Sequence, residues 1–214
     1  MSIMWQGENV LFGLGDIAVG YFLGSIPSAY IMEHLRKGVD IRELGVGNVG
    51  AANVLRHVGV WEGIVVGLTD IAKGTAAILI AQALGVSQLW LLGAGFSALL
   101  GHNFPVFVGF RGGKGSATII GIFLVLAPKE IGIVLGIMTI PFLITRNFAF
   151  AICVGFGFLP LLIWLFGGSL MLVFYSLAIL IFIGIRSLPS AGQAWPKVRK
   201  NKDISTNHRH IHIV

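Results

Sequence analysis

The first stretch whose residues could take part in chemistry is rich in glycine and reads RELGVGNVGAANVLRHVG, over residues 42–59. Three glycines in it allow positive φ and a close approach of the backbone to a ligand: Gly45, Gly47 and Gly50. Successive N–H groups in such a turn bind anions, and the side chains of Asn48 and Asn53 add donors. Arg56 adds a forked cation that suits a phosphate. No hydrophobic strand precedes the stretch, which excludes a dinucleotide fold and leaves either an anion site or a tight turn between helices.

A second glycine-rich stretch reads GHNFPVFVGFRGGKGSATIIG, over residues 101–121. Gly112 and Gly113 precede Lys114, as in phosphate-binding loops. The stretch is not a Walker motif, because Gly115 follows the lysine and the first glycine is missing at the required spacing. What remains is a cation on a glycine turn directly before a helix, whose N-terminus favours anions.

Polar side chains flank this glycine turn on both sides. Ser116 and Thr118 fall near the N-terminus of the expected helix. His102 precedes the turn, at the end of an apolar run. There it is either a general base or a histidine that satisfies a neighbouring backbone group.

A third candidate is the pair Asp70 and Lys73, in TDIAKGTAA. The two residues are three apart, so they share one face of a helix and can form an ion pair. Ionisable groups near bilayer depth are costly unless they are paired, so the pair is a candidate functional site. A structural salt bridge near the membrane interface explains it equally well.

The composition places these stretches in a membrane protein. Of the 214 residues, 56% are hydrophobic and 11% are charged, and the mean hydropathy is +0.88, whereas soluble domains carry about 25% charged residues. A net charge of +6 then fits anionic lipid headgroups and substrates better than nucleic acid. The single cysteine, Cys153, excludes an intramolecular disulfide. No basic residue precedes the first apolar run, so we expect no cleaved signal peptide.

We expect an all-α fold with about seven membrane-crossing helices, because a bilayer core about 30 Å thick needs roughly 20 apolar residues in a helix. The apolar runs fall at residues 10–31, 63–84, 88–106, 116–128, 131–145, 148–166 and 169–186. The fourth and fifth runs are short and are separated by the segment 128–130, so they form either two spans or a re-entrant hairpin. Either arrangement returns the chain to the side of the membrane that it left.

Basic residues predict the orientation of these spans. With the N-terminus outside, 13 of the 15 Lys and Arg residues lie on the cytoplasmic side, as the positive-inside rule requires. Lys73 lies in or near a span, and only Lys129 lies outside. The cytoplasmic residues are Arg36, Lys37, Arg42, Arg56, Arg111, Lys114, Arg146, Arg186, Lys197, Arg199, Lys200, Lys202 and Arg209.

This topology makes residues 1–187 a single transmembrane domain and residues 188–214 a polar cytoplasmic tail. The tail carries alternating histidines that suggest a metal site: His208, His210 and His212. No carboxylate or cysteine cluster lies nearby, so we expect no metal there.

Both glycine-rich stretches lie on the cytoplasmic side in this topology. Their glycines and cations together predict a site for two phosphates at the cytoplasmic interface. A transporter or channel would distribute ionisable residues through several spans. Only Asp16 and the pair Asp70 and Lys73 lie within the spans here, so transport is the weaker alternative.

Four strings also carry a family resemblance: GSIPSAY at 24–30, GVGNVGAANVLR at 45–56, DIAKG at 70–74 and GHNFPVFVGFRGGKGSAT at 101–118. In this order they resemble the acyl-phosphate-dependent glycerol-3-phosphate acyltransferases of bacteria, over about residues 10–125. The resemblance implies a seven-span enzyme of the inner membrane whose site faces the cytoplasm. Such an enzyme moves an acyl group from acyl phosphate to the 1-position of glycerol-3-phosphate, giving lysophosphatidic acid and phosphate, without an acyl carrier, coenzyme A or a metal.

The resemblance also implies roles for individual residues. It implies a backbone hole that takes the acyl phosphate, formed with Asn48 by Gly45, Gly47 and Gly50. It implies that Arg56 and Lys114 hold the glycerol phosphate and offset its charge. It places further residues on the substrate-binding surface: Ser25, Asn53, His102, Gly112 and Gly113. Acyl phosphate is already activated, so positioning and charge stabilisation supply much of the rate, and a protein nucleophile is not obligatory.

The chain departs from the family's usual residues at several positions. The family usually has serine at Val46, threonine at Ala52 and serine at Ala149. Its C-terminal signature has a histidine and an asparagine, then an arginine and a late glutamate, where this chain has Ser187 and Ser190 in the nearest alignment. Each lost hydroxyl contact is worth about 1 kcal/mol. The alternative is therefore that this chain is a family member that binds a lipid phosphate without turning it over.

Overall fold

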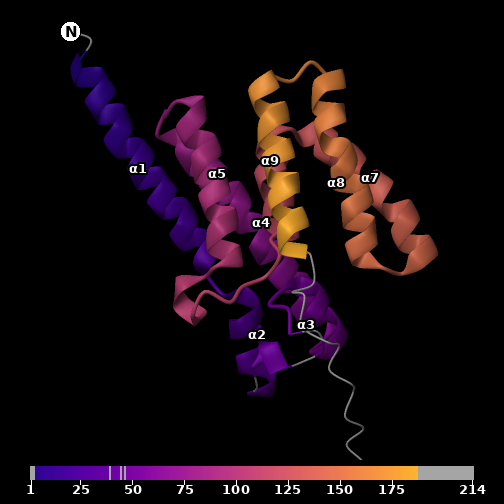
Figure 1. Ribbon diagram of the computed structural model, residues 1–214. Helices are drawn as coiled ribbons and strands as arrows, with labels where there is room; N and C mark the ends of the chain where they lie inside the picture. The colour runs from indigo at the N-terminus through magenta and orange to yellow at the C-terminus, as the bar shows by residue number, and fades with distance from the viewer. Residues whose placement is uncertain (1–2, 39, 44, 46, 188–214) are drawn as a thin grey trace, which may run out of the picture.

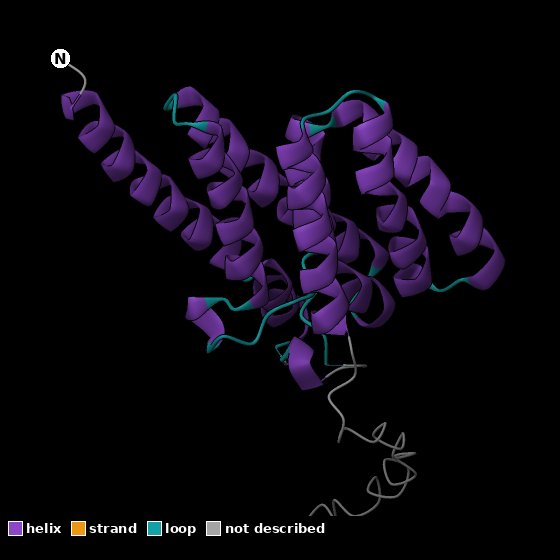
Figure 2. Cartoon of the chain, turned by 45° about the horizontal axis from the view of Figure 1, so that its top comes forward, coloured by secondary structure: helices purple, strands orange, loops and turns teal. Residues whose placement is uncertain are grey.

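The computed structural model describes residues 3–38, 40–43, 45 and 47–187, and its regular elements there are all helices (Figure 2). Those ranges contain no strand, so the prediction of an all-α fold is confirmed. In chain order the elements are α1 Ile3–Ser25, α2 Ser28–Lys37, the 3-10 helix η1 Ile41–Glu43, α3 Ala51–His57, α4 Val60–Ala83, α5 Gln88–Asn103, the 3-10 helix η2 Val106–Val108, α6 Ser116–Leu126, α7 Pro128–Thr145, α8 Phe148–Leu165 and α9 Leu170–Ser187.

Several helices have the length and composition of membrane spans. Within the described ranges five segments qualify: Val10–Arg36, Val60–Ala83, Gln88–Val108, Pro128–Thr145 and Phe148–Leu165. The helices α6 and α9 are apolar but shorter. With 11 residues, α6 extends only about 17 Å. The chain is thus a multi-span membrane protein. The expected seven spans include α6 and α9 in addition to these five segments.

The predicted first span, residues 10–31, lies within the candidate span Val10–Arg36, but it is not one continuous helix. The helix α1 ends at Ser25, and a new helix, α2, begins at Ser28. The cause is Pro27, which disfavours the helical conformation of the residue before it. The other predicted runs begin and end within a few residues of α4 to α9.

The long helices form a bundle, and the short helices α2 and α3 lie at one end of it (Figure 1). In the bundle α1 packs along α5, α4 packs along α6, and α7 packs along α8. The two glycine-rich loops lie at the same end as α2 and α3 (Figure 1). The bundle therefore gathers at one end the two loops that the sequence singled out.

Glycines bring neighbouring helices to backbone contact, as small residues do between membrane helices. A Cβ at Gly74 of α4 would lie 2.1 Å from the carbonyl oxygen of Thr118, and a Cβ at Gly121 of α6 would lie 1.9 Å from that of Ile71. A Cβ at Gly24 of α1 would lie 2.0 Å from the carbonyl oxygen of Ala98 in α5. The contacts at Gly74 and Gly121 fix where α6 lies against α4, and the contact at Gly24 fixes where α1 lies against α5.

Two apolar clusters hold the bundle and its loops. The larger cluster fills the bundle and includes Leu99, Phe123 and Phe156. The smaller cluster lies beneath the first glycine-rich loop and joins it to α2 and α4: Ala29, Ile41, Val49, Val54 and Val66. Burial of these side chains holds the first loop on the bundle.

Candidate active site

A cavity of about 200 Å³ lies where the first glycine-rich loop, the turn before α6 and the N-terminus of α8 meet. Its polar lining comes from Asn48, Asn53, Arg56, Asp70, His102, Lys114, Ser116 and Asn147. Segments far apart in the sequence thus contribute polar and cationic groups to one space.

Six of the predicted site residues line this cavity: Asn48, Gly50, Asn53, Arg56, His102 and Lys114. Gly45, Gly47 and Gly113 do not line it. Gly112 lines a second, smaller hollow, to which His102 also contributes. Ser25 lines neither; it is fully buried, and its hydroxyl has no hydrogen-bond partner among the described residues.

The first loop adopts the backbone conformation that glycine permits. Gly45 has φ +59° and Gly47 has φ +69°, as the glycine pattern predicts. Gly50 differs, because its φ of −156° is extended and it is the residue that precedes α3. A Cβ at Gly45 would lie 2.3 Å from Nε2 of His57, so this glycine is required for packing as well as for its turn.

Contacts around η1 hold the start of the first loop. The guanidinium of Arg42 donates to both carboxylate oxygens of Asp40, and its Nη1 donates to the carbonyl oxygen of Val108 at 3.3 Å. The hydrogen bonds from Arg42 hold the pKa of the Asp40 carboxyl below its usual value. Asn53 donates to the carbonyl oxygen of Ile41 at 3.4 Å. Arg42 therefore braces the loop and leaves Arg56 as the loop's cation at the cavity.

The second loop is held by the C-terminal end of α5. The N–H of Gly113 donates to the carbonyl oxygen of His102 at 3.2 Å, and the N–H of Gly112 donates to that of Asn103 at 3.2 Å. With its amide nitrogen turned to the loop, Asn103 also donates to the carbonyl oxygens of Gly113 at 2.6 Å and Lys114 at 3.2 Å. The predicted glycine turn before a helix is therefore confirmed.

Two helices present their N-termini to the cavity. Ser116 is the first residue of α6 and Phe148 is the first residue of α8, and both line the cavity. Unpaired N–H groups and the helix dipole favour anions at such ends. Arg56 and Lys114 line the same cavity, so two cations and two helix N-termini face one space.

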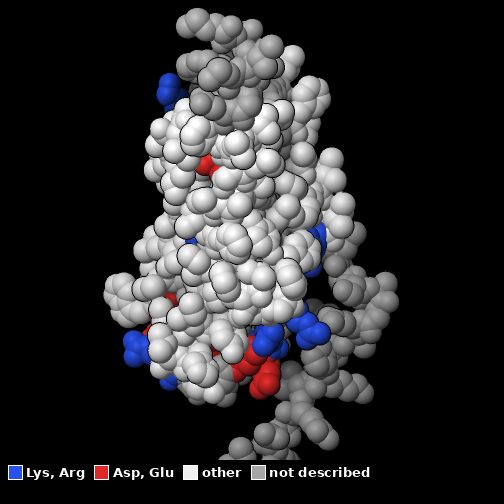
Figure 3. Space-filling model, turned by 90° about the vertical axis from the view of Figure 1, so that its left-hand side faces the viewer, with Lys and Arg blue, Asp and Glu red and all other residues white. Residues whose placement is uncertain are grey.

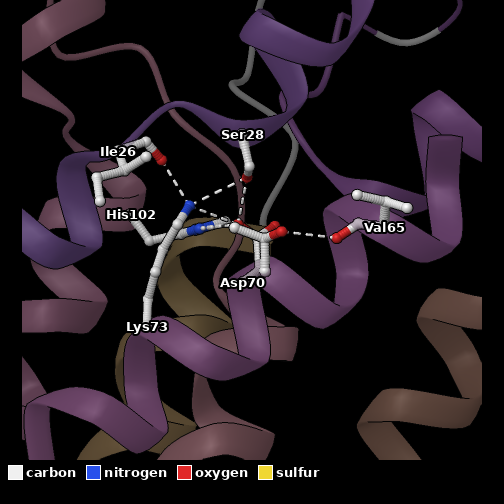
Figure 4. Close-up of polar contacts among 7 residues, drawn as sticks. Ile26, Ser28, Val65, Asp70, Lys73 and His102 are labelled. Carbon is white, nitrogen blue, oxygen red and sulfur yellow. Dashed lines mark hydrogen bonds and ion pairs between the residues drawn. The ribbon is translucent and has the colours of Figure 1, made fainter.

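Asp70 and Lys73 form an ion pair inside α4, as their spacing predicts (Figure 4). The distance from Nζ of Lys73 to Oδ1 of Asp70 is 2.7 Å, and both side chains are buried. Ser28 donates to the same carboxylate oxygen at 2.6 Å. Asp70 and Lys73 touch different spaces, because Asp70 lines the main cavity and Lys73 lines the smaller hollow.

Comparison with known proteins identifies the family of this chain. A family model described as glycerol-3-phosphate acyltransferase matches residues 14–189. The glycerol-3-phosphate acyltransferase 1 of Dehalococcoides mccartyi is 39% identical over 177 residues, which cover 80% of this chain and 85% of that protein. The chain belongs to the glycerol-3-phosphate acyltransferase family.

Solved structures extend this similarity to the fold. The crystal structure of PlsY (YgiH), an integral membrane glycerol 3-phosphate acyltransferase, in its glycerol 3-phosphate form superposes with a TM-score of 0.77 at 34% identity. The match covers 81% of this chain and 87% of PlsY. The lysophosphatidic acid form matches with a TM-score of 0.72 at 31% identity and the same coverage. The family resemblance of the sequence is therefore confirmed.

Two of the departures from the family's usual residues lie at the cavity. Ala52 and Ala149 both line it, so each places a methyl group where the family usually has a hydroxyl. Val46 and Ser190 lie outside the described residues, and Ser187 ends α9.

Of the wall that α8 contributes, the sequence singled out only Ala149. Asn147, Phe148 and Ile152 line the cavity beside Ala149. The local signal was an asparagine directly before an apolar run, which marks a helix cap. Asn147 does accept a hydrogen bond from the N–H of Phe150 at 3.2 Å. That signal predicts where α8 begins, but it does not predict which loops α8 faces.

Proposed function

We propose that this protein transfers a fatty acyl group from acyl phosphate to glycerol-3-phosphate, giving lysophosphatidic acid and inorganic phosphate. The oxygen of the 1-hydroxyl attacks the acyl carbonyl carbon, the bond from that carbon to the phosphate oxygen breaks, and the hydroxyl proton leaves with the phosphate. Membership of the acyltransferase family supports the reaction class. The choice of acyl phosphate as donor follows from the motifs that the chain shares with that family.

The observation that carries the proposal is the convergence of Arg56, Lys114 and two helix N-termini on one cavity. The reaction brings together two phosphate groups that repel each other, so a site must offset more than one negative charge. Arg56 offers a fork for bidentate contacts, and Lys114 offers a point charge on an exposed side chain. We assign the acyl phosphate to the part of the first loop that lines the cavity, Asn48 and residues 50–53, and the glycerol phosphate to Arg56 and Lys114, chiefly to Lys114.

An activated donor shifts the catalytic task to positioning. Holding the hydroxyl against the acyl carbon contributes to the rate by removing the entropy cost of the encounter. Cations and N–H groups at the cavity stabilise the charge that develops on the carbonyl oxygen and the leaving phosphate. A protein nucleophile is therefore not obligatory, and we propose direct attack of the alcohol on the acyl carbon.

In the membrane, we place the cavity on the cytoplasmic side and the N-terminus outside, with α6 and α9 completing seven spans. Two observations support this orientation. Arg56 and Lys114 lie with the loops at one end of the bundle. On the face drawn in Figure 3, most Lys and Arg side chains also gather at that end, and cytoplasmic loops are enriched in these residues. We place residues 188–214 on the same side as a polar tail.

The test is turnover by the purified protein with palmitoyl phosphate and glycerol-3-phosphate, following the release of phosphate and the formation of lysophosphatidic acid. Phosphate release that depends on glycerol-3-phosphate supports the proposal. The matched blank is the double variant Arg56→Ala/Lys114→Ala, which removes both cations of the cavity. If parent and blank release phosphate at the same rate, the protein is not an acyltransferase with these substrates.

A second candidate function is the binding of a lipid phosphate without turnover. Ala52 and Ala149 favour it, because both remove hydroxyls from the cavity that would align the attacking alcohol. Titration of the purified protein with lysophosphatidic acid separates the two functions. Binding by a parent that releases no phosphate supports the second candidate, and turnover by the parent excludes it.

A further inference from the structure

The buried pair in α4 is the centre of a polar network that the proposed reaction does not use. Asp70 is 1% exposed and Lys73 is 4% exposed. Besides Asp70, Nζ of Lys73 donates to the carbonyl oxygen of Ile26 at 2.5 Å and to Oγ of Ser28 at 3.0 Å (Figure 4). The three donors of the ammonium group therefore have three acceptors. Through these hydrogen bonds, Lys73 holds the segment between α1 and α2 against α4.

Asp70 has a further contact, which points away from that break. Its Oδ1 lies 3.6 Å from Nδ1 of His102, at the C-terminal end of α5 (Figure 4). A carboxylate at this distance favours the ring orientation that directs Nδ1 toward it. Asp70 and His102 both line the main cavity, so this contact forms part of its wall.

The other edge of the His102 ring lies against the glycine turn that carries Lys114. A Cβ at Gly113 would lie 2.4 Å from Nε2 of His102, so the ring fills the space that the missing side chain leaves. The carbonyl oxygen of His102 also accepts the N–H of Gly113. Rotation of the ring would therefore press on the backbone one residue before Lys114.

We propose that Asp70 is a positioning residue for Lys114, acting through the imidazole of His102. The carboxylate fixes the ring, the ring sets the backbone at Gly113, and this backbone directs the ammonium group of Lys114 into the cavity. The inference rests on the proposed function only in that Lys114 must bind the phosphate of glycerol-3-phosphate. It gives the buried pair two separate tasks, since Lys73 holds the corner between α1 and α2 while Asp70 holds the turn.

A purely structural ion pair is the competing explanation, so the test must separate stability from positioning. The double variant Asp70→Leu/Lys73→Met replaces the pair by apolar side chains, an exchange that buried ion pairs often tolerate. The single variant Lys73→Met removes the hydrogen bonds from Lys73 to Ile26 and Ser28 but retains Asp70 beside His102. It also leaves a buried carboxylate without its cation, so it is expected to be the less stable of the two.

Binding of glycerol-3-phosphate to purified protein, measured by titration calorimetry, is the readout, and the melting temperature is recorded for each variant. We expect the double variant to raise the Kd for glycerol-3-phosphate about tenfold, in line with the loss of a charge-assisted contact. Lys73→Met should raise the Kd less, although its melting temperature is lower. If Kd and melting temperature instead change in the same order, the pair is only structural and the inference is wrong.

Coupling to Lys114 provides the second arm. In a Lys114→Ala background, the double variant should change the Kd by less than twofold, because the group that Asp70 positions is already missing. An undiminished tenfold effect in that background would show that Asp70 acts by another route. The matched control is Asp16→Asn in α1, a carboxyl 2% exposed that does not line the cavity. It should leave the Kd unchanged.

The outcomes also separate this inference from the proposed function. A parent that binds glycerol-3-phosphate but releases no phosphate from palmitoyl phosphate contradicts the proposed reaction and leaves the inference intact. A parent that turns over while the double variant retains its Kd contradicts the inference alone. A parent that binds no glycerol-3-phosphate overturns both.

Discussion

At the scale of single residues, the two cations of the cavity differ in how they are held. Lys114 follows a turn whose carbonyl and N–H groups bond to the end of α5, so the backbone sets its direction. Arg56 lies in the last turn of the seven-residue helix α3 and is exposed. A lysine binds a dianion chiefly by charge, whereas an arginine adds directed bidentate hydrogen bonds. The two residues should therefore bind a phosphate group in different ways.

For Lys114→Ala we expect weaker handling of glycerol-3-phosphate. The KM for glycerol-3-phosphate should rise roughly 10- to 100-fold, because a hydrogen bond to a charged group is worth about 1.5–3 kcal/mol. The KM for acyl phosphate should change less. Steady-state kinetics with each substrate varied in turn measure both values. Lys129→Ala, an exposed lysine in the first turn of α7 that does not line the cavity, is the control. A rise in the acyl-phosphate KM alone would reverse our assignment of the two phosphates.

Ala149→Ser restores a hydroxyl that the family usually has. Ala149 lies in the first turn of α8 and lines the cavity, so a serine there reaches the reacting groups without disturbing a packed core. We expect kcat to rise several-fold, consistent with about 1 kcal/mol of added hydrogen bonding in the transition state. The KM for acyl phosphate should change little. Ala178→Ser, on the exposed face of α9, adds the same hydroxyl away from the cavity and should have no effect. Equal kinetics in both variants would remove Ala149 from the site.

At the scale of elements, the packing of α4 against α6 determines the site. Asp70 and Lys73 lie on α4, while the turn with Lys114 leads directly into α6. The two helices meet at Gly74 and Gly121, where backbone touches backbone. A displacement of α6 would therefore move the N-terminus that faces the cavity.

We predict that Gly121→Ala lowers both the melting temperature and the activity. The added Cβ would lie 1.9 Å from the carbonyl oxygen of Ile71, so α6 must move away from α4. A steric conflict of this kind costs about 1–3 kcal/mol. Gly132→Ala in α7 is the matched control, because a Cβ there would meet no atom within 4 Å beyond the neighbouring backbone of its own helix. That substitution should be neutral or slightly stabilising, since alanine favours helix. The comparison uses thermal unfolding and phosphate release, and equal melting temperatures would show that α6 tolerates the shift.

The elements also show what the sequence could predict. Long apolar runs predicted the positions of α4 to α9 because membrane helices are selected by local hydropathy. The glycine pattern predicted the positive φ of Gly45 and Gly47. The family resemblance pointed to Ala149 of α8, but no pattern could reveal that its neighbours Asn147, Phe148 and Ile152 line the cavity, or that Asn103 holds the glycine turn. Those contacts depend on how helices far apart in the chain pack together, and no periodicity within one segment encodes that.

At the scale of the whole molecule, the two ends of the bundle differ in the polar loops that they carry. The loops with Arg56 and Lys114 lie at one end, together with α2 and α3 (Figure 1). Substrates with phosphate groups are confined to water and headgroups, whereas an acyl chain partitions into lipid. A cavity at the end of a bundle lets both parts of an acyl phosphate remain in their preferred surroundings. Orientation in the membrane then decides which compartment supplies glycerol-3-phosphate.

We predict that the N-terminus and the turn between α4 and α5 face the outside and that the C-terminal tail faces the cytoplasm. Single cysteines at Ser87, in that turn, and at Lys200, in the tail beyond the described residues, report the two sides. Cys153 is exposed on α8 and is first replaced by alanine, so that it adds no background label. A membrane-impermeant maleimide should label residue 87 in intact cells and residue 200 only after permeabilisation. We expect this result because the opposite orientation would place 13 of the 15 basic residues outside the cell, against the positive-inside rule. Labelling of residue 200 in intact cells would reverse the orientation and place the cavity away from the cytoplasm.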